Sequence, residues 1–199
     1  MDFQNIKNLY KVRQTLLEMI HDRGYIIPEE EYITFEQFIL KYNSKQLDIY
    51  IENNHKKIYV HHHMDQKNFS KNDLKLIMQK MIQEYQDENI HLLLLLKDKE
   101  NSTISKELSK EMYKNVEVFL KRNMMFNITH HVFVPKHILL TKEEEVELLE
   151  KYHTTKGKLP KLSRTDPIAK YYGMKPDQIC KIIRKSPEVG ESIYYRLVR

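Results

Sequence analysis

Apolar residues at three- and four-residue intervals predict helices in the first part of the chain. The clearest case runs from residue 3 to 22, and Gly24 stands where a helix commonly ends in a left-handed turn. Two later segments, 28–43 and 70–85, have the same spacing. Ser70 is expected to cap the second of them, because a serine hydroxyl accepts hydrogen bonds from the free amides of a helix's first turn.

Segments rich in β-branched and aromatic residues predict strands among these helices. Residues 47–51 and 57–63 flank a short polar stretch and indicate a hairpin. Residues 90–96 are unbroken apolar sequence, which is typical of a central strand covered on both faces. A polar loop and a short helix up to residue 113 should then lead to a strand at 116–120.

The last third of the chain contains more specific signals. Thr141 and Glu144 form a capping box, which predicts the start of a helix. Asp166 followed by proline predicts a second, short helix that ends at Gly173. Residues 179–184 and 192–198 should be strands that pair across the turn between them.

Two domains with different architectures are expected. Helices and strands alternate over residues 1–133, which predicts an α/β domain with helices against a small sheet. We place the boundary near Pro135 and expect residues 134–199 to form a small α+β domain.

Composition and charge limit the kind of protein this can be. With 199 residues and 41% apolar residues, the chain can bury a substantial core. A single cysteine, Cys180, excludes an internal disulfide, and neither a signal peptide nor a membrane-spanning run is visible, so an intracellular protein is expected. Residues 134–199 contain 14 Lys and Arg against 9 Asp and Glu, a surplus of five that equals the whole net charge of +5. Such a surplus can attract nucleic acid or an acidic protein, although it more often serves solubility.

Several stretches of the sequence occur in the order found in a known family. The run TDPIAKYYG at 165–173 lies between LPKL at 159–162 and the closing segments ICKIIR at 179–184 and YYRLV at 194–198. Together they resemble the assembly domain of the RNA polymerase subunit called H in archaea, whose eukaryotic counterpart is the fifth subunit shared by the nuclear polymerases. Residues 126–141 are similar to the family's join between domains. Residues 13–25 resemble the first helix and turn of its longer, eukaryotic-type form.

This resemblance implies a non-catalytic subunit of a multisubunit DNA-directed RNA polymerase, without a cofactor or metal. The C-terminal assembly domain would anchor one copy of the chain to the largest subunit, within a complex that includes other polymerase subunits. The interface candidates are His137, Arg164, Asp166, Pro167, Tyr171, Tyr172, Gly173, Lys181, Arg184, Tyr195 and Arg196. The N-terminal domain would be an endonuclease-like sheet with helices that forms a jaw beside the downstream DNA duplex. Its DNA-facing candidates are Lys97, Lys99, Ser102, Thr103 and Lys106, in a segment that lacks the proline common in the family.

The sequence gives weaker support for a metal site, a cysteine nucleophile or a nuclease centre. On a strand, His61 and His63 share one face while His62 points to the other, and no nearby cysteine completes a zinc site, so surface or core histidines are favoured. Cys180 could be a nucleophile beside a histidine, but its place in an apolar strand favours a buried structural role. Asp48 could be the first metal carboxylate of a nuclease, yet the adjacent strand has no acid–lysine pair to complete such a centre.

The alternatives are therefore a stand-alone DNA-binding or nuclease-like protein, and a regulatory adaptor that mimics the polymerase subunit. Abundant Lys, Ile and Asn suggest an A+T-rich coding genome, and the divergent N-terminal half within a eukaryotic-type two-domain layout favours a large DNA virus as the source, with a divergent protist as the alternative. A viral chain would work in the host cytoplasm and the virion, and a cellular one in the nucleus.

Overall fold

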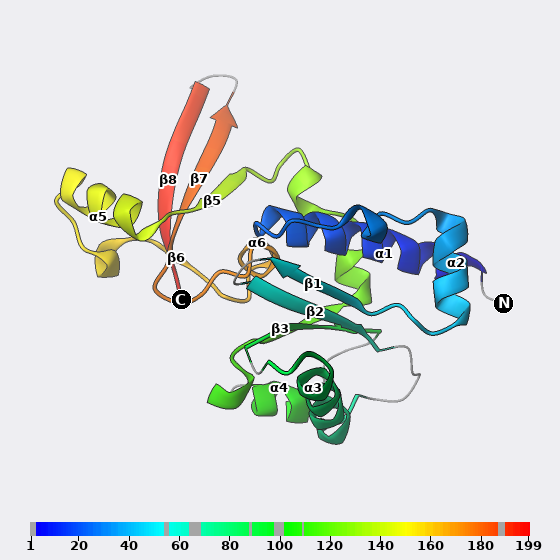
Figure 1. Cartoon of the computed structure of the whole chain (residues 1–199). Coiled ribbons are helices and arrows are strands. Elements are labelled where there is room, and N and C mark those ends of the chain that lie inside the picture. Colours follow the sequence, from blue (N-terminus) through cyan, green and yellow to red (C-terminus); the bar gives the residue numbers. More distant parts are fainter. Residues whose placement is uncertain are drawn as a thin grey trace. The chain divides into compact units, whose positions relative to one another are not determined.

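The computed structural model describes residues 3–53, 56–63, 69–87, 89–97, 102–108, 110–186 and 190–199. The chain divides into two compact units, Met1–Phe126 and Asn127–Arg199 (Figure 1). The sequence-based boundary at residue 134 falls inside the second unit, and the limits of the functional domains stay a prediction. No helix among the described residues is both long and apolar enough to cross a membrane.

The first unit mixes helices and strands as the alternating pattern predicts. Its elements in chain order are α1 (Phe3–Asp22), η1 (Glu29–Glu31), α2 (Phe35–Asn43), β1 (Ile49–Asn53), β2 (Lys56–His62), α3 (Lys71–Tyr85), β3 (His91–Leu96), α4 (Ser102–Leu108), η2 (Glu111–Tyr113), β4 (Val116–Leu120) and η3 (Lys121–Met124).

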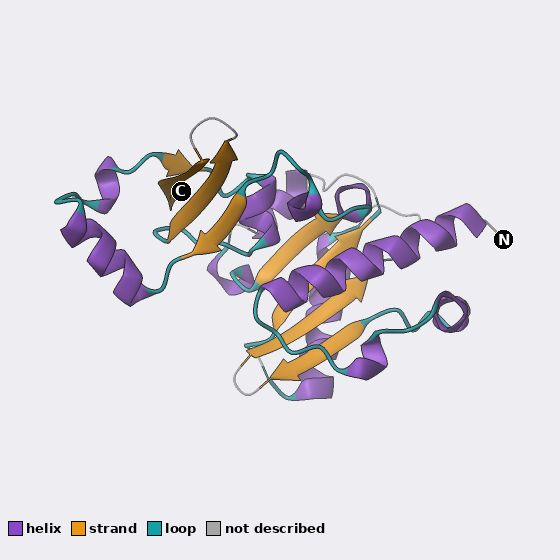
Figure 2. Cartoon of the chain, turned by 90° about the horizontal axis from the view of Figure 1, so that it is seen from above, coloured by secondary structure: helices purple, strands orange, loops and turns teal. Residues whose placement is uncertain are grey.

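The strands of this unit form one sheet in the order β1-β2-β3-β4. β1 and β2 are the expected antiparallel hairpin, whereas β3 runs parallel to both β2 and β4. A parallel step needs a crossover connection, and α3 and α4 supply the two crossovers. α1 lies over one face of the sheet, and α3 and α4 lie on the other (Figures 1 and 2).

β3 shows why this layering requires an unbroken apolar strand. Leu92, Leu94 and Leu96 belong to a cluster that includes Leu74 of α3 and Ile104 of α4. The alternate residues of a strand point to the opposite face, and these too are buried, at most 3% exposed. The prediction of a central strand covered on both faces is confirmed.

The second helical segment begins later than its apolar spacing suggests. Residues 29–31 form the 3₁₀ turn η1, and α2 starts only at Phe35. The Thr34 hydroxyl accepts the Gln37 amide proton while the Gln37 side chain accepts from the Thr34 amide, so Thr34 and Gln37 form a capping box. This T-x-x-Q signal is visible in the sequence and sets the helix start.

The second unit contains η4 (Ile128–His130), β5 (Lys136–Leu139), α5 (Lys142–Lys151), η5 (Lys156–Lys158), β6 (Lys161–Leu162), α6 (Pro167–Tyr171), β7 (Ile179–Ser186) and β8 (Gly190–Val198). Its sheet has the order β5-β7-β8-β6, and β7 and β8 pair antiparallel as predicted. β5 and β6 were not predicted, because such short strands are defined by their partner strand rather than by a pattern of their own.

Different helices cover the two faces of the sheet in the second unit. Cys180, Ile182 and Val198 pack with Ala169 of α6 and with Met174. Ile179 and Leu197, on the opposite face, pack with Leu148 of α5. The small core therefore depends on α5 and α6 being held firmly against the sheet.

Candidate assembly and DNA-facing surfaces

The segment 165–173 folds as its residues predict. The Asp166 carboxylate accepts hydrogen bonds from the amides of Ile168 at 2.8 Å and Ala169 at 3.4 Å, which caps α6. Pro167 occupies the first turn, where a backbone N–H would have no partner within the helix, so its absence costs no helical hydrogen bond. Gly173 has a φ of 60°, a conformation that side chains with a Cβ disfavour, so the chain can turn out of the helix there.

Tyr171 ties this helix to the start of the second unit. Its side chain is only 3% exposed, and its hydroxyl accepts a hydrogen bond of 2.9 Å from Asn127 Nδ2. The side-chain oxygen of Asn127, Oδ1, in turn accepts hydrogen bonds from the amide and the hydroxyl of Thr129. Tyr172 packs edge-on against Tyr171, with ring centroids 5.1 Å apart. Tyr171 is therefore a buried residue that holds α6 in place, and it is not itself exposed to a partner.

The remaining interface candidates are divided between the two faces of the sheet. Lys181 of β7 stands directly opposite Tyr195 of β8. Because side chains alternate along a strand, Arg184 and Arg196 lie on the other face, together with His137.

On that second face, the His137 ring donates to the Pro135 carbonyl at 2.7 Å, and burial lowers the pKa of His137. The Arg184 guanidinium lies 5.0 Å from the centroid of the Tyr194 ring. Arg164 is exposed, and its backbone amide donates to the Arg199 carbonyl. The eleven candidates thus surround the sheet and α6 and do not form one patch.

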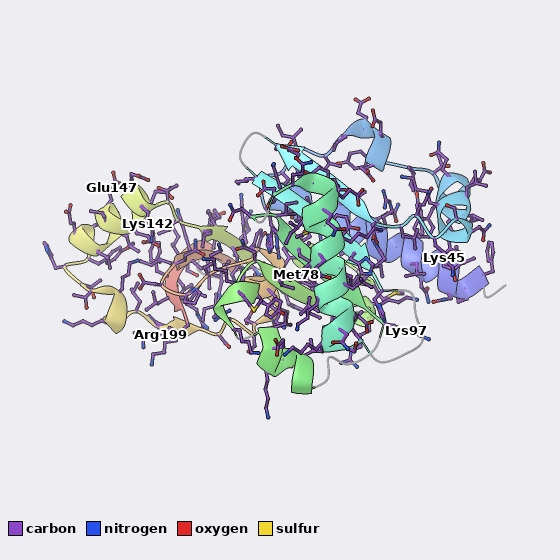
Figure 3. All side chains as sticks on the ribbon, turned by 60° about the horizontal axis from the view of Figure 1, so that its bottom comes forward. Lys45, Met78, Lys97, Lys142, Glu147 and Arg199 are labelled. Atoms are coloured by element: carbon purple, nitrogen blue, oxygen red, sulfur yellow. The ribbon has the colours of Figure 1, made fainter. Side chains whose placement is uncertain are left out.

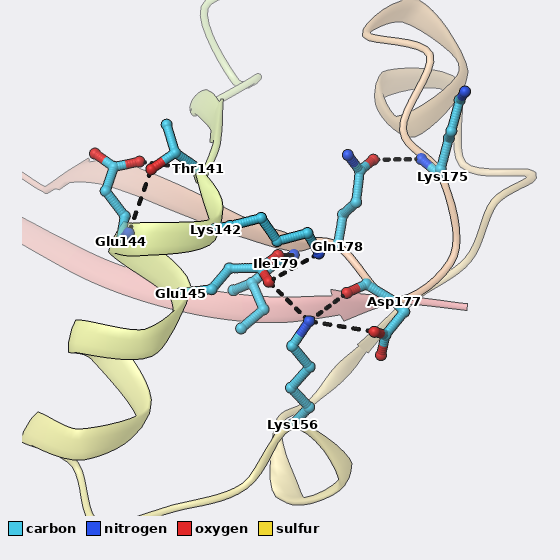
Figure 4. A network of polar contacts seen from close by, with 9 residues as sticks. All are labelled: Thr141, Lys142, Glu144, Glu145, Lys156, Lys175, Asp177, Gln178 and Ile179. Carbon is cyan, nitrogen blue, oxygen red and sulfur yellow. Dashed lines mark hydrogen bonds and ion pairs between the residues drawn. The ribbon is translucent and has the colours of Figure 1, made fainter.

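A buried carboxylate that sequence reasoning did not single out joins three parts of this unit (Figure 4). Glu145 of α5 is 3% exposed and contacts Lys156 Nζ at 2.7 Å and Lys142 Nζ at 3.3 Å. Its other oxygen accepts the Ile179 amide proton at 3.0 Å. Burial alone raises the pKa of Glu145, but these hydrogen bonds outweigh it and lower the pKa. Glu145 is the last of three consecutive glutamates at the start of α5, and nothing in the sequence indicates which of them will be buried.

The DNA-facing candidates lie around the connection from β3 to α4. Lys97 directly follows β3 and is exposed, and Figure 3 labels it. Ser102 and Thr103 begin α4, and Lys106 is exposed in the same helix. Lys99 lies outside the described residues. The exposed lysines of this segment therefore belong to one connection at the carboxyl end of a central strand.

Asp48 is engaged in a network that leaves it a structural role. Its carboxylate accepts hydrogen bonds from the Tyr59 hydroxyl at 2.7 Å, the His61 ring at 2.9 Å and the His62 amide at 2.9 Å. Burial raises the pKa of Asp48, but these three donors outweigh it and hold the pKa at about 2. The carboxylate is thus already surrounded by donors, which gives the nuclease reading no support.

The histidine cluster and the cysteine also have structural places. His62 is buried, and burial lowers its pKa to about 4, so the ring is neutral at pH 7. His63 packs edge-on against Phe69. Cys180 is fully buried, and burial raises the pKa of its thiol to about 11, so the thiolate needed for a nucleophile is disfavoured. In the described ranges, no group of three His, Cys, Asp or Glu side chains is placed to hold a metal ion.

Comparison with known proteins assigns both units to one family. The model described as "RNA polymerase Rpb5, N-terminal domain" matches residues 4–81, and "RNA polymerase Rpb5, C-terminal domain" matches residues 126–198. The Caenorhabditis elegans protein named DNA-directed RNA polymerases I, II, and III subunit RPABC1 is 32% identical over 200 residues, which cover 96% of this chain and 95% of the relative. The Dictyostelium discoideum protein of the same name is 34% identical, with 98% of each chain covered. The chain therefore belongs to the Rpb5 family of RNA polymerase subunits.

Proposed function

We propose that the chain is a non-catalytic subunit of a multisubunit DNA-directed RNA polymerase, in which it positions other parts and the reaction belongs to other subunits. The observation that carries this proposal is the continuous similarity to polymerase subunits over nearly the whole length of both chains. The engaged Asp48 carboxylate and the buried Cys180 speak against an independent catalytic centre.

The second unit is proposed as the assembly domain that docks on the largest subunit. The Asp166 cap fixes the start of α6, the bond between Asn127 and Tyr171 ties α6 to the segment before η4, and Ala169 packs α6 against the sheet. Exposed Arg164 and Pro167 are consequently held at defined positions, which lowers the entropy lost when a partner orders them.

The first unit is proposed as the jaw beside downstream DNA. Lys97 and Lys106 would contact backbone phosphates, and such contacts position a duplex without reading its sequence. Only a few lysines are involved and residues 1–133 contain 19 Lys and Arg against 19 Asp and Glu, so we expect a weak, salt-sensitive contact.

The place of action follows from the enzyme to which the subunit belongs. A cellular chain would work in the nucleus, and a viral one in the host cytoplasm and the virion. The identity of the polymerase that retains the chain decides between these two origins.

Affinity purification of the tagged full chain from its native cells tests the assembly role. We expect the two largest polymerase subunits in amounts equal to the chain at moderate salt. Replacing both exposed signature residues, Arg164→Ser with Pro167→Ser, should reduce this recovery, whereas Lys175→Ser on the exposed loop after α6 should not. Recovery of the chain alone, or with DNA and without polymerase, would contradict the proposal.

A further inference from the structure

One edge of β8 offers unpaired backbone groups. The Leu197 amide donates to the Pro160 carbonyl and the Arg199 amide to the Leu162 carbonyl, so odd-numbered residues of β8 direct their N–H and C=O groups away from β7. β6 pairs with β8 only at Leu197 and Val198. The outward groups of Ile193 and Tyr195 have no backbone partner in the part of the chain that the structure describes.

Pro160 explains why the pairing stops there. In the parallel register of β6 and β8, the next hydrogen bond would run from the amide of residue 160 to the Tyr195 carbonyl. Proline has no N–H and cannot make it. The two residues before it, Lys158 and Leu159, turn away and donate their amide protons to Thr155 and Lys156. The edge is therefore left open by the covalent structure of the preceding segment.

An apolar groove of about 480 Å³ lies along this open edge. Its lining includes Leu148 of α5, Tyr152 directly after that helix, Leu159, Pro160 and the stretch of β8 from Ile193 to Arg196. Ile193 is 50% exposed and Tyr152 is 58% exposed, and the rings of Tyr152 and Tyr195 are 6.0 Å apart. Large apolar side chains and an unpaired edge thus lie side by side within one unit.

We propose that an extended segment of another polymerase subunit adds to β8 as a fifth strand, with alternate apolar side chains in this groove. A strand satisfies unpaired N–H and C=O groups at the spacing of a sheet, and the pockets beside the edge select its side chains. Nucleic acid offers neither the spacing nor the apolar side chains. This inference rests on the proposed function and specifies how the second unit is held.

The charges around the edge indicate the composition of this segment. Lys151 Nζ lies 6.0 Å from the centroid of the Tyr152 ring, which lines the groove, and the Arg184 guanidinium lies over the Tyr194 ring on the opposite face of the sheet. Arg196 also borders the groove. Because cations lie on both sides, the added strand should combine apolar residues toward the groove with acidic residues beside them.

Hydrogen exchange of the full chain, free and within the purified polymerase, tests the geometry directly. In the free chain the amides of Ile193 and Tyr195 should exchange fast, while those of Tyr194 and Arg196 are slow because they bond to β7. Within the polymerase, Ile193 and Tyr195 should slow by at least about tenfold, which is the effect of about 1.4 kcal/mol of protection.

Fast exchange at Ile193 and Tyr195 in a polymerase that retains the chain would overturn the added strand and leave the proposed function intact. Absence of the chain from the polymerase would instead overturn the proposed function. Protection in the free chain that rises with its concentration would assign the edge to a second copy, which also contradicts the inference.

A proline at the edge supplies an independent test. Ile193→Pro removes an outward N–H and leaves the bonds between β7 and β8 in place, as prolines in edge strands do. Retention in the polymerase should fall about tenfold, since a hydrogen bond is lost and the ring blocks the approach. Ile193→Val is the matched control, and an unchanged thermal unfolding midpoint shows that the variant is folded. Full retention of a folded Ile193→Pro variant would contradict the inference.

A photo-crosslinking amino acid at Tyr152 in the assembled polymerase identifies the occupant. A crosslink to a segment of another subunit in which apolar and acidic residues alternate would support the inference. Crosslinks to DNA or RNA, or to residues 3–126 of the chain itself, would overturn it.

Discussion

Glu145 shows what one buried carboxylate does for the second unit. It joins the first turn of α5 to Lys156 and to the first residue of β7, so three segments depend on its charge. A buried carboxylate is tolerated only when donors surround it, and here three donors do so.

The first prediction is that Glu145→Gln destabilises the chain by about 2 kcal/mol. Glutamine can still accept the Ile179 amide proton, but its amide nitrogen then faces the ammonium groups of Lys142 and Lys156, which lose this acceptor and its charge. Urea unfolding followed by circular dichroism measures the change. Glu147→Gln, an exposed glutamate of the same helix, should shift the curve by less than about 0.5 kcal/mol. Equal effects of the two variants would show that the network around Glu145 does not contribute to the free energy of unfolding.

The lowered pKa of Asp48 predicts how the stability of the chain changes at acidic pH. Its pKa in the folded chain is about 2, below the ordinary 3.8, so its contribution to stability is present above pH 4 and is lost as the pH falls toward 2. A shift of this size corresponds to about 2 kcal/mol. Asp48→Asn should therefore unfold more easily than the unmodified chain at pH 7, and the difference should shrink between pH 4 and pH 2.

Urea unfolding at pH 7, 4 and 2.5 measures this dependence. Glu36→Gln, an exposed carboxylate of α2, serves as the control and should leave the pH profile unchanged. A difference between Asp48→Asn and the unmodified chain that stays constant across these pH values would contradict the assigned network.

At the scale of elements, short helices of this chain depend on their caps. Thr141 and Glu144 exchange hydrogen bonds between side chain and backbone, at 3.3 Å and 2.8 Å, and fix where α5 begins. The start of α5 in turn places Glu145 next to Ile179. A cap therefore influences the tertiary network through the register of its helix.

Thr141→Ala should consequently lower the free energy of unfolding by about 1 kcal/mol. Thr155 offers a matched control, since it precedes η5 at the corresponding position but makes no side-chain cap bond. Thr155→Ala should be nearly neutral in the same thermal or urea measurement. A larger effect at Thr155 than at Thr141 would count against the capping argument.

The whole molecule combines two compact units, and the role proposed for each can be tested separately. The proposed assembly surface and the open edge of β8 belong to the second unit, whereas the lysines near α4 belong to the first. Substitutions in one unit should therefore leave the role of the other unchanged.

For the first unit, Lys97→Gln with Lys106→Gln in the assembled polymerase should weaken the grip on downstream duplex DNA. Each phosphate contact contributes about 0.9 to the slope of log affinity against log salt concentration, so the slope should become shallower by up to about 2. Salt titration of polymerase bound to a labelled downstream duplex measures it. Lys45→Gln, an exposed lysine after α2, should have no effect, and an unchanged slope in the double variant would remove this segment from the DNA-facing surface.

The sequence by itself determined those features that depend on neighbouring residues. The apolar spacing of α1, the unbroken apolar run of β3, and the capping signals at Ser70, Thr141 and Asp166 all appeared as predicted. Each is a local preference: a helix face, a two-sided strand or a hydroxyl or carboxylate within reach of free amides. The family was also recognisable, because its signature consists of short stretches of sequence that follow one another in a fixed order.

Only the tertiary structure decided which polar groups are buried and which backbone edges stay open. Nothing near Glu145 or Asp48 in the sequence shows that the carboxylate will be enclosed, since Lys156 and Ile179 are 11 or more positions away from Glu145, and Tyr59 is 11 positions away from Asp48. The short strands β5 and β6 exist because β7 and β8 offer them hydrogen bonds. The open edge of β8 likewise depends on the register that places Pro160 opposite it, and a register is a property of two segments together.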